Sequence, residues 1–93
     1  MYNELNPILH SQLRLAIISF LVSNGTSNFN ELKKVTGATA GNISVQLKKL
    51  EQAGYITIKK SFKDNYPHTS LEITEAGIDA FEEYVNAIKQ YLK

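Results

Sequence analysis

Two side-chain amides are the residues whose type and spacing most directly suggest a chemistry. Asn42 and Gln46 lie four positions apart, so in a helix they would stand side by side on one face. Either amide can pair bidentately with the edge of an adenine in the major groove of duplex DNA. Val45, beside them, has methyl groups that could contact the methyl of a thymine. The three residues predict a surface that reads base edges.

Lysines follow the amides along the chain. Lys48 and Lys49 have long, mobile side chains that suit phosphates, and phosphate contacts position a protein on DNA without reading its sequence. Thr39, Ser44 and the free N–H groups at a helix start could also bind phosphate. Each residue alone is also typical of a solvated helix face, so only the combination indicates nucleic acid. The residues predicted to contact DNA from this segment are Thr39, Ala40, Gly41, Asn42, Ser44, Val45, Gln46, Lys48 and Lys49.

Two helices are expected to position this surface. Thr39 can cap a helix over residues 40–53. Its predicted buried stripe is Ile43, Leu47 and Leu50. A shorter helix over residues 31–36, capped by Asn30, is expected to precede it, after a short extended piece at 26–29. Two short helices joined by a tight turn containing glycine are typical of a helix-turn-helix.

Leu32 and Val35 of the shorter helix are expected to face inward. A longer helix before it is predicted to start at Pro7, capped by Asn6, with apolar residues on two sides from Ile8 to Val22. In so short a chain, a second subunit could cover its second side. Arg14, inside this helix, is expected to pair with an acid of the last helix or with a DNA phosphate.

A β-hairpin is predicted after the helix-turn-helix. Residues 55–62 alternate in the manner of a strand, residues 63–67 favour a turn, and residues 69–73 form a second strand. The hairpin residues predicted to contact DNA are Lys60, Lys63, Asn65, Tyr66 and His68.

The last helix is expected over residues 75–92, capped by Thr74, with apolar residues at alternating steps of three and four. Such a seam could pair with a second copy of the chain or fold back onto the first helix. The residues predicted to form a dimer interface are Leu5, Ile8, Leu15, Ile18, Ile78, Phe81, Tyr84, Val85, Ile88, Tyr91 and Leu92.

Composition narrows the classes of protein. The 93 residues include no cysteine, which excludes a disulfide framework and a cysteine nucleophile. His10 and His68 are the only histidines, so we expect no metal site, and no motif indicates a catalytic residue or a cofactor. No secretory signal or membrane span is evident, so a cytoplasmic protein that does not contact the membrane is expected.

Charge is unevenly distributed. Residues 39–63 carry five lysines against one glutamate, a net charge of +4. Residues 64–93 carry two lysines against six acids, a net charge of −4. A basic middle beside an acidic end predicts one face that meets a polyanion and another that does not.

The order of these patterns resembles a family. The chain is similar to small winged helix-turn-helix transcriptional regulators of the MarR and ArsR type. Its most specific stretch runs from Gly41-Asn42-Ile43-Ser44 through Leu47-Lys48-Lys49-Leu50-Glu51-Gln52-Ala53-Gly54-Tyr55-Ile56, which resembles a recognition helix and the step into the wing. The other stretches that carry the resemblance are 13–17, 29–32, 67–69 and 71–77.

The resemblance implies a homodimer on DNA, with recognition helices in successive major grooves and wing tips near the minor groove. The tip here departs from the family by lacking arginine. We therefore expect one winged helix-turn-helix domain over residues 1–93, mainly α with a small β-hairpin (α+β), and no enzyme. The expected function is sequence-specific binding of double-stranded DNA as a homodimeric repressor on a pseudo-palindromic operator. A protein-interaction module without DNA binding is the alternative, and the sequence leaves a small-molecule effector open.

Overall fold

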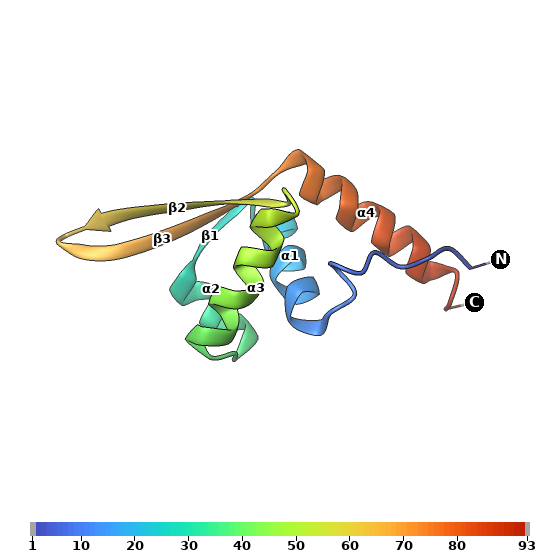
Figure 1. Cartoon of the computed structure of the whole chain (residues 1–93), viewed down its shortest axis with the longest axis horizontal. Coiled ribbons are helices and arrows are strands. Elements are labelled where there is room, and N and C mark those ends of the chain that lie inside the picture. The colour runs from blue at the N-terminus through green and yellow to red at the C-terminus, as the bar shows by residue number, and fades with distance from the viewer. Residues whose placement is uncertain (1, 93) are drawn as a thin grey trace.

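The computed structural model describes residues 2–92. These residues form an elongated fold of four helices and a three-stranded antiparallel sheet, which confirms the predicted α+β class (Figure 1). The elements are α1 (Gln12–Asn24), β1 (Thr26–Asn28), α2 (Phe29–Thr36), α3 (Ala40–Gln52), β2 (Ile56–Lys63), β3 (Tyr66–Ile73) and α4 (Glu75–Lys89).

The sheet has the strand order β1-β3-β2, so β3 is its central strand. Leu71 of β3 lies opposite both Ile58 of β2 and Ser27 of β1. Because β1 stops at Asn28, opposite Ser70, the outer part of the hairpin has no third strand beside it. The hairpin therefore projects beyond the helices along the longest dimension of the molecule, which is 54 Å (Figure 1).

The turn of the hairpin contains only Asp64 and Asn65, both with positive φ angles of 53° and 66°. Left-handed residues of these two types suit the two-residue turn that best matches the twist of paired strands. Consequently β3 begins at Tyr66, three residues earlier than predicted. Pro67 is tolerated within it because β1 ends before that point and no strand there requires its missing N–H.

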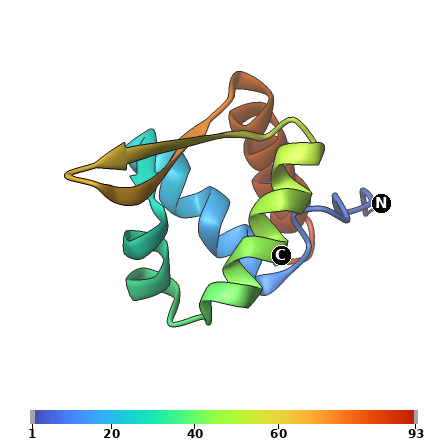
Figure 2. The same cartoon turned by 60° about the vertical axis from the view of Figure 1, so that its left-hand side comes forward.

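Figure 2 shows α1 between α2 and α3, with the sheet across one end of the three helices. Between these helices, a stripe of apolar side chains from α3 meets a stripe from α1, and the side chains of both stripes are fully or almost fully buried. The predicted stripe Ile43, Leu47 and Leu50 is confirmed. The core is completed by Leu9, Ile17, Ile18, Leu21, Leu32, Ile56, Leu71, Ala80 and Tyr84.

The start of α1 was predicted too early. Asn6 caps only an isolated turn, in which its Oδ1 accepts from the N–H of Ile8 at 2.8 Å and of Leu9 at 3.3 Å. The turn places Leu9 in the core, and Ser11 is extended, so the helix begins afresh at Gln12.

The cap and the inner face of α2 also differ from the prediction. Asn28, not Asn30, is the N-cap and accepts from the N–H of Glu31 at 2.9 Å. Val35 is 52% exposed rather than inward. The covered stripe runs through Phe29, Leu32 and Thr36, and Val35 lies to the other side of Leu32 on the helix.

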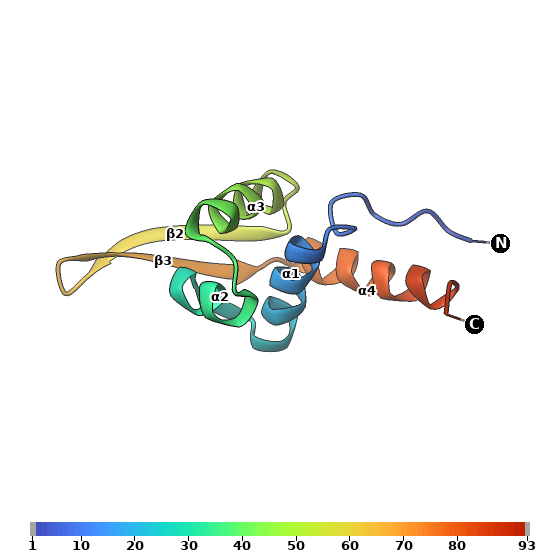
Figure 3. The same cartoon turned by 90° about the horizontal axis from the view of Figure 1, so that it is seen from below.

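Helix α4 ends at Lys89, earlier than predicted, and buries Gly77, Ala80, Tyr84 and Ala87 against its own chain. The N-terminal segment lies along its far end (Figure 3). There Asn3 N–H donates to Gln90 Oε1 at 2.7 Å, and the Tyr91 hydroxyl donates to Asn3 O at 2.9 Å. The rings of Tyr2 and Tyr91 stack with centroids 4.7 Å apart.

Two residues of the predicted dimer interface are covered within a single chain, which corrects that part of the prediction. Ile18 is fully buried in the core, and Tyr84 is only 6% exposed. The Tyr84 hydroxyl lies 3.0 Å from His10 Nδ1. Both side chains pack within one chain. Helix α4 packs against the rest of its own chain through a face that lies next to the predicted seam.

Gly77 should tolerate no side chain. A Cβ there would lie 2.9 Å from Ile73 Cδ1 and closer still to the backbone oxygen of Tyr55. We expect Gly77→Ala to lower the free energy of unfolding by about 1–3 kcal/mol or more, measured by chemical denaturation. Gly41→Ala is the control, because a Cβ at that helical position meets nothing within 4 Å and should raise stability by up to about 1 kcal/mol. Equal effects of the two substitutions would contradict this packing.

Candidate nucleic-acid interface

Helix α3 is presented with one face in the core and the other open. Its N-cap is Thr39, as predicted, whose Oγ1 accepts from the N–H of Asn42 at 3.2 Å. Val45 is 53% exposed on the outer face. The other predicted DNA-contacting residues that are exposed are Thr39, Ala40, Gly41, Asn42, Ser44, Lys48 and Lys49, whereas Gln46 is half-buried.

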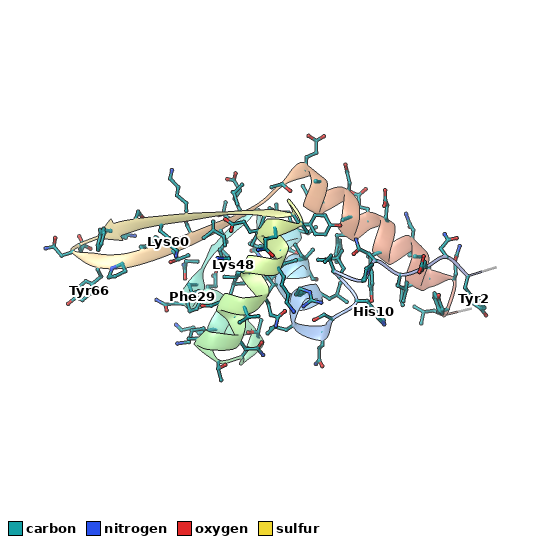
Figure 4. The ribbon with its side chains drawn as sticks, in the orientation of Figure 1. Tyr2, His10, Phe29, Lys48, Lys60 and Tyr66 are labelled. Atoms are coloured by element: carbon teal, nitrogen blue, oxygen red, sulfur yellow. The ribbon has the colours of Figure 1, made fainter. Side chains whose placement is uncertain are left out.

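A groove of about 690 Å³ joins the outer face of α3 to the base of the hairpin. Lys48 from α3 and Lys60 from β2 both line it, so the structure brings together a lysine of each element (Figure 4). The remaining lining residues are Phe29, Ser44, Leu47, Glu51, Ile58 and Thr69. The groove therefore carries two lysines and one glutamate, and hydroxyl and apolar groups make up the rest of its lining.

The five predicted hairpin residues do not share one face. Successive residues of a strand point to opposite sides, so Lys60 is on the groove side with Ile58. Lys63, which pairs with Tyr66, is on the other side. His68, opposite Ser61, is also on that other side and is half-buried. Asn65 lies in the turn.

Phe62 is a candidate that the sequence reasoning missed. It follows Lys60 on the groove side of β2, lies opposite Pro67 and is 78% exposed. The alternation of the strand assigns Phe62 to the same face as Ile56, which is buried in the core, and Ile58, which is half-buried against it. Only the length of the hairpin beyond the helices exposes it.

Arg14 is engaged by Ile8 and Gln46 rather than by the expected acid of the last helix. Its Nε donates to the backbone oxygen of Ile8 at 2.6 Å, and its Nη1 donates to Gln46 Oε1 at 2.6 Å. Gln46 Nε2 in turn donates to Asn42 Oδ1 at 2.9 Å. The two amides are side by side as their spacing predicts, but both ends of the Gln46 amide are already engaged.

Within the part of the chain that the structure describes, neither a metal site nor a membrane-spanning helix is found. No three His, Cys, Asp or Glu side chains among residues 2–92 are grouped so that they could hold a metal ion. None of the helices found there is long and apolar enough to cross a membrane. The open face of α3 with the adjoining groove is thus the site that the fold presents.

A helix-turn-helix followed by a projecting hairpin defines a winged helix protein; α3 is its recognition helix and the β2–β3 hairpin its wing. Residues 13–92 match the winged helix DNA-binding domain family. The chain belongs to this family, whose members are DNA-binding transcriptional regulators rather than a class of enzyme, and its fold is of the MarR-like type.

Three similar proteins share the sequence or the fold of this chain. The uncharacterized protein MJ0432 of Methanocaldococcus jannaschii is 36% identical over 86 residues, covering 92% of this chain and 94% of the relative. A transcriptional regulator homologue from Pyrococcus horikoshii superposes with a TM-score of 0.85 at 29% identity, over 91% of this chain and 84% of that one. A mutant MarR from E. coli, complexed with operator DNA, has the same fold at 19% identity, with a TM-score of 0.77 over 92% and 61% of the two chains.

The cap of the recognition helix should be measurable on its own. Thr39→Ala removes the oxygen that accepts from the N–H of Asn42 and should lower the free energy of unfolding by about 1 kcal/mol. Thr39→Ser keeps a hydroxyl in place and should stay within a few tenths of the parent value. Thermal and chemical denaturation of the three proteins check this. Equal losses in both variants would show that the hydroxyl does not cap α3.

Proposed function

We propose that this protein binds specific sequences of duplex DNA as a homodimer and represses transcription by covering an operator. The observation that carries the proposal is the open outer face of α3, which shares one groove with a lysine of the wing. A helix of this kind fits the major groove, which is wide enough to admit it. The proposal implies a location beside chromosomal DNA, in the cytoplasm.

The residues divide by their chemistry. Asn42 and Val45 are short, exposed and near the start of the helix, so we assign them to base edges. Lys48, Lys49 and Lys60 are assigned to phosphates, where an ammonium group acts as a mobile point charge. For the wing, exposed Phe62 and Pro67 beside Lys60 are side chains of the kind that enter a minor groove without arginine.

The proposed dimer rests on the apolar side chains that one chain leaves partly uncovered. Helix α4 keeps Ile78, Phe81, Val85 and Ile88 half-exposed on one side, and Leu92 beyond it is 77% exposed. Apolar surface of this extent is typical of an association site. Two-fold symmetry would set half-site centres about 34–36 Å apart on a pseudo-palindromic operator. A repressor that occupies such a site would block transcription by position alone.

Binding should weaken steeply as salt is added, because lysines displace counterions from the phosphates. Lys48→Ala should weaken binding to all duplexes alike and reduce the slope of log K against log salt by about one for each phosphate that the protein no longer neutralises. Fluorescence anisotropy at four salt concentrations measures this. Lys89→Ala, on the opposite end of the molecule, is the matched control and should leave the slope unchanged. A slope near zero for the parent protein would refute the phosphate contacts.

The parent protein should sediment at twice its 10.4 kDa chain mass at micromolar concentration. Leu92→Glu places a charge in the proposed interface at an exposed position, so it should shift the mass toward one chain without unfolding the protein. Phe62→Ser removes an equally exposed apolar side chain from the wing and should leave the mass at two chains. Analytical ultracentrifugation of the three proteins tests this. A parent mass of one chain would eliminate the dimer.

A second candidate function is docking to another protein without DNA. The exposed Val45 and Tyr66, the latter 74% exposed, favour it because aromatic and apolar side chains are enriched at protein interfaces. A random duplex at low salt separates the two functions. A gel shift at micromolar protein supports DNA binding, and the absence of a shift supports docking.

A further inference from the structure

A row of three side chains runs from inside the fold to the outer face of α3. Arg14 of α1 donates to Gln46 Oε1, and Gln46 Nε2 donates to Asn42 Oδ1. Arg14 and Gln46 are half-buried, whereas Asn42 is exposed. The row therefore begins at a charged group within the structure and ends where a ligand of α3 would lie.

The direction of every hydrogen bond in this row follows from its first member. A guanidinium carries only donors, so the atom of Gln46 that faces Arg14 must be its oxygen. The nitrogen of Gln46 is then left for Asn42, and the atom of Asn42 that faces it must again be an oxygen. The Asn42 nitrogen, with both its hydrogens, is the atom left for a partner outside the row.

Arg14 is well placed to impose this direction. Its Nε donates to Ile8 O at 2.6 Å, so the guanidinium is held at two points and cannot turn without losing a second hydrogen bond. Ile8 belongs to the turn that Asn6 caps, which ties the row to the segment before α1. An amide that could otherwise rotate by half a turn thus has one preferred orientation.

We propose that Arg14 and Gln46 are positioning residues that present Asn42 to DNA as a hydrogen-bond donor, so that the recognition helix selects guanine where Asn42 meets the bases. Guanine offers two acceptors in the major groove, N7 and O6, whereas adenine offers one acceptor beside a donor. This inference rests on the proposed DNA binding. It replaces the adenine contact that amides alone suggest, and it removes Gln46 from the residues that read bases.

Gln46→Glu is the decisive variant, because it reverses the row at its second member. A glutamate still accepts from Arg14 but cannot donate, so Asn42 must turn its nitrogen inward and its oxygen outward. An outward acceptor fits the exocyclic amino groups of adenine and cytosine. The variant should therefore exchange a preference for guanine for a preference for one of those bases.

The experiment first selects bound duplexes from a random pool with the full-length parent protein. The base position that Asn42 reads is the one whose preference disappears in Asn42→Ala. Four duplexes that differ only there are then titrated with each protein by anisotropy. The parent should favour guanine over adenine by about five- to tenfold or more, and Gln46→Glu should lose or invert that ratio. Arg14→Lys keeps a donor and should retain the guanine preference, whereas Arg14→Ala should relax it.

Gln52→Glu is the matched control, because it makes the same change of charge at an exposed position of the same helix. It should lower affinity for all four duplexes alike and keep the ratio between them. Parent selection of adenine, or an unchanged guanine ratio in Gln46→Glu, would overturn the inference while leaving DNA binding intact. Failure of the parent to bind any duplex would instead overturn the proposed function and the inference with it. Melting curves for every variant show that the proteins compared are folded.

Discussion

The burial of three side chains of one helix is the constraint on which the rest of this structure depends. Ile43, Leu47 and Leu50 are buried in the core, and their spacing determines which side of α3 faces outward. Any rotation of the helix that hid Val45 would draw these aliphatic groups into water, at a cost of about 1.5–3 kcal/mol for each. The open face is thus enforced by the core behind it. Nothing within residues 2–92 covers that face, so its exposure is best explained by a function of the residues on it.

The exposure of the wing results from the small number of elements that pack beside it. Strand β3 is central only near its end, where short β1 pairs with it and Leu71 reaches the core. Between Ser70 and its tip, the hairpin is held together by the pairing of β2 with β3 and by a two-residue turn whose left-handed positions suit Asp64 and Asn65. A hairpin that leaves the body of a small domain exposes both of its faces. Lys60 consequently lines the groove beside α3 and Phe62 lies further out on the same side of β2, whereas Lys63 and Tyr66 are on the other side.

The sequence alone predicts the order of elements and the exposed surface of α3, because periodicity and capping residues report local geometry. Thr39 and Thr74 cap the helices they were expected to cap. The errors arise where a tertiary contact decides. Asn6 resembles a helix cap but closes a separate turn that inserts Leu9 into the core, and Tyr84, expected at a dimer interface, is buried against its own chain. Arg14 reaches across to Gln46, a contact between residues 32 positions apart for which no local pattern exists.

Basic and acidic residues are separated along the long axis of the molecule. The basic residues of segment 39–63 belong to α3 and the wing, whereas most of the acids that follow belong to α4, at the opposite end in Figure 1. The length of 54 Å exceeds the screening length of about 8–10 Å at physiological salt several times over, so the two ends act as separate fields. A polyanion is attracted to one end and repelled from the other, which orients the protein before contact. The repelled end is also the one with the partly uncovered apolar seam of α4, so a second copy could pair there without competing with the polyanion for surface.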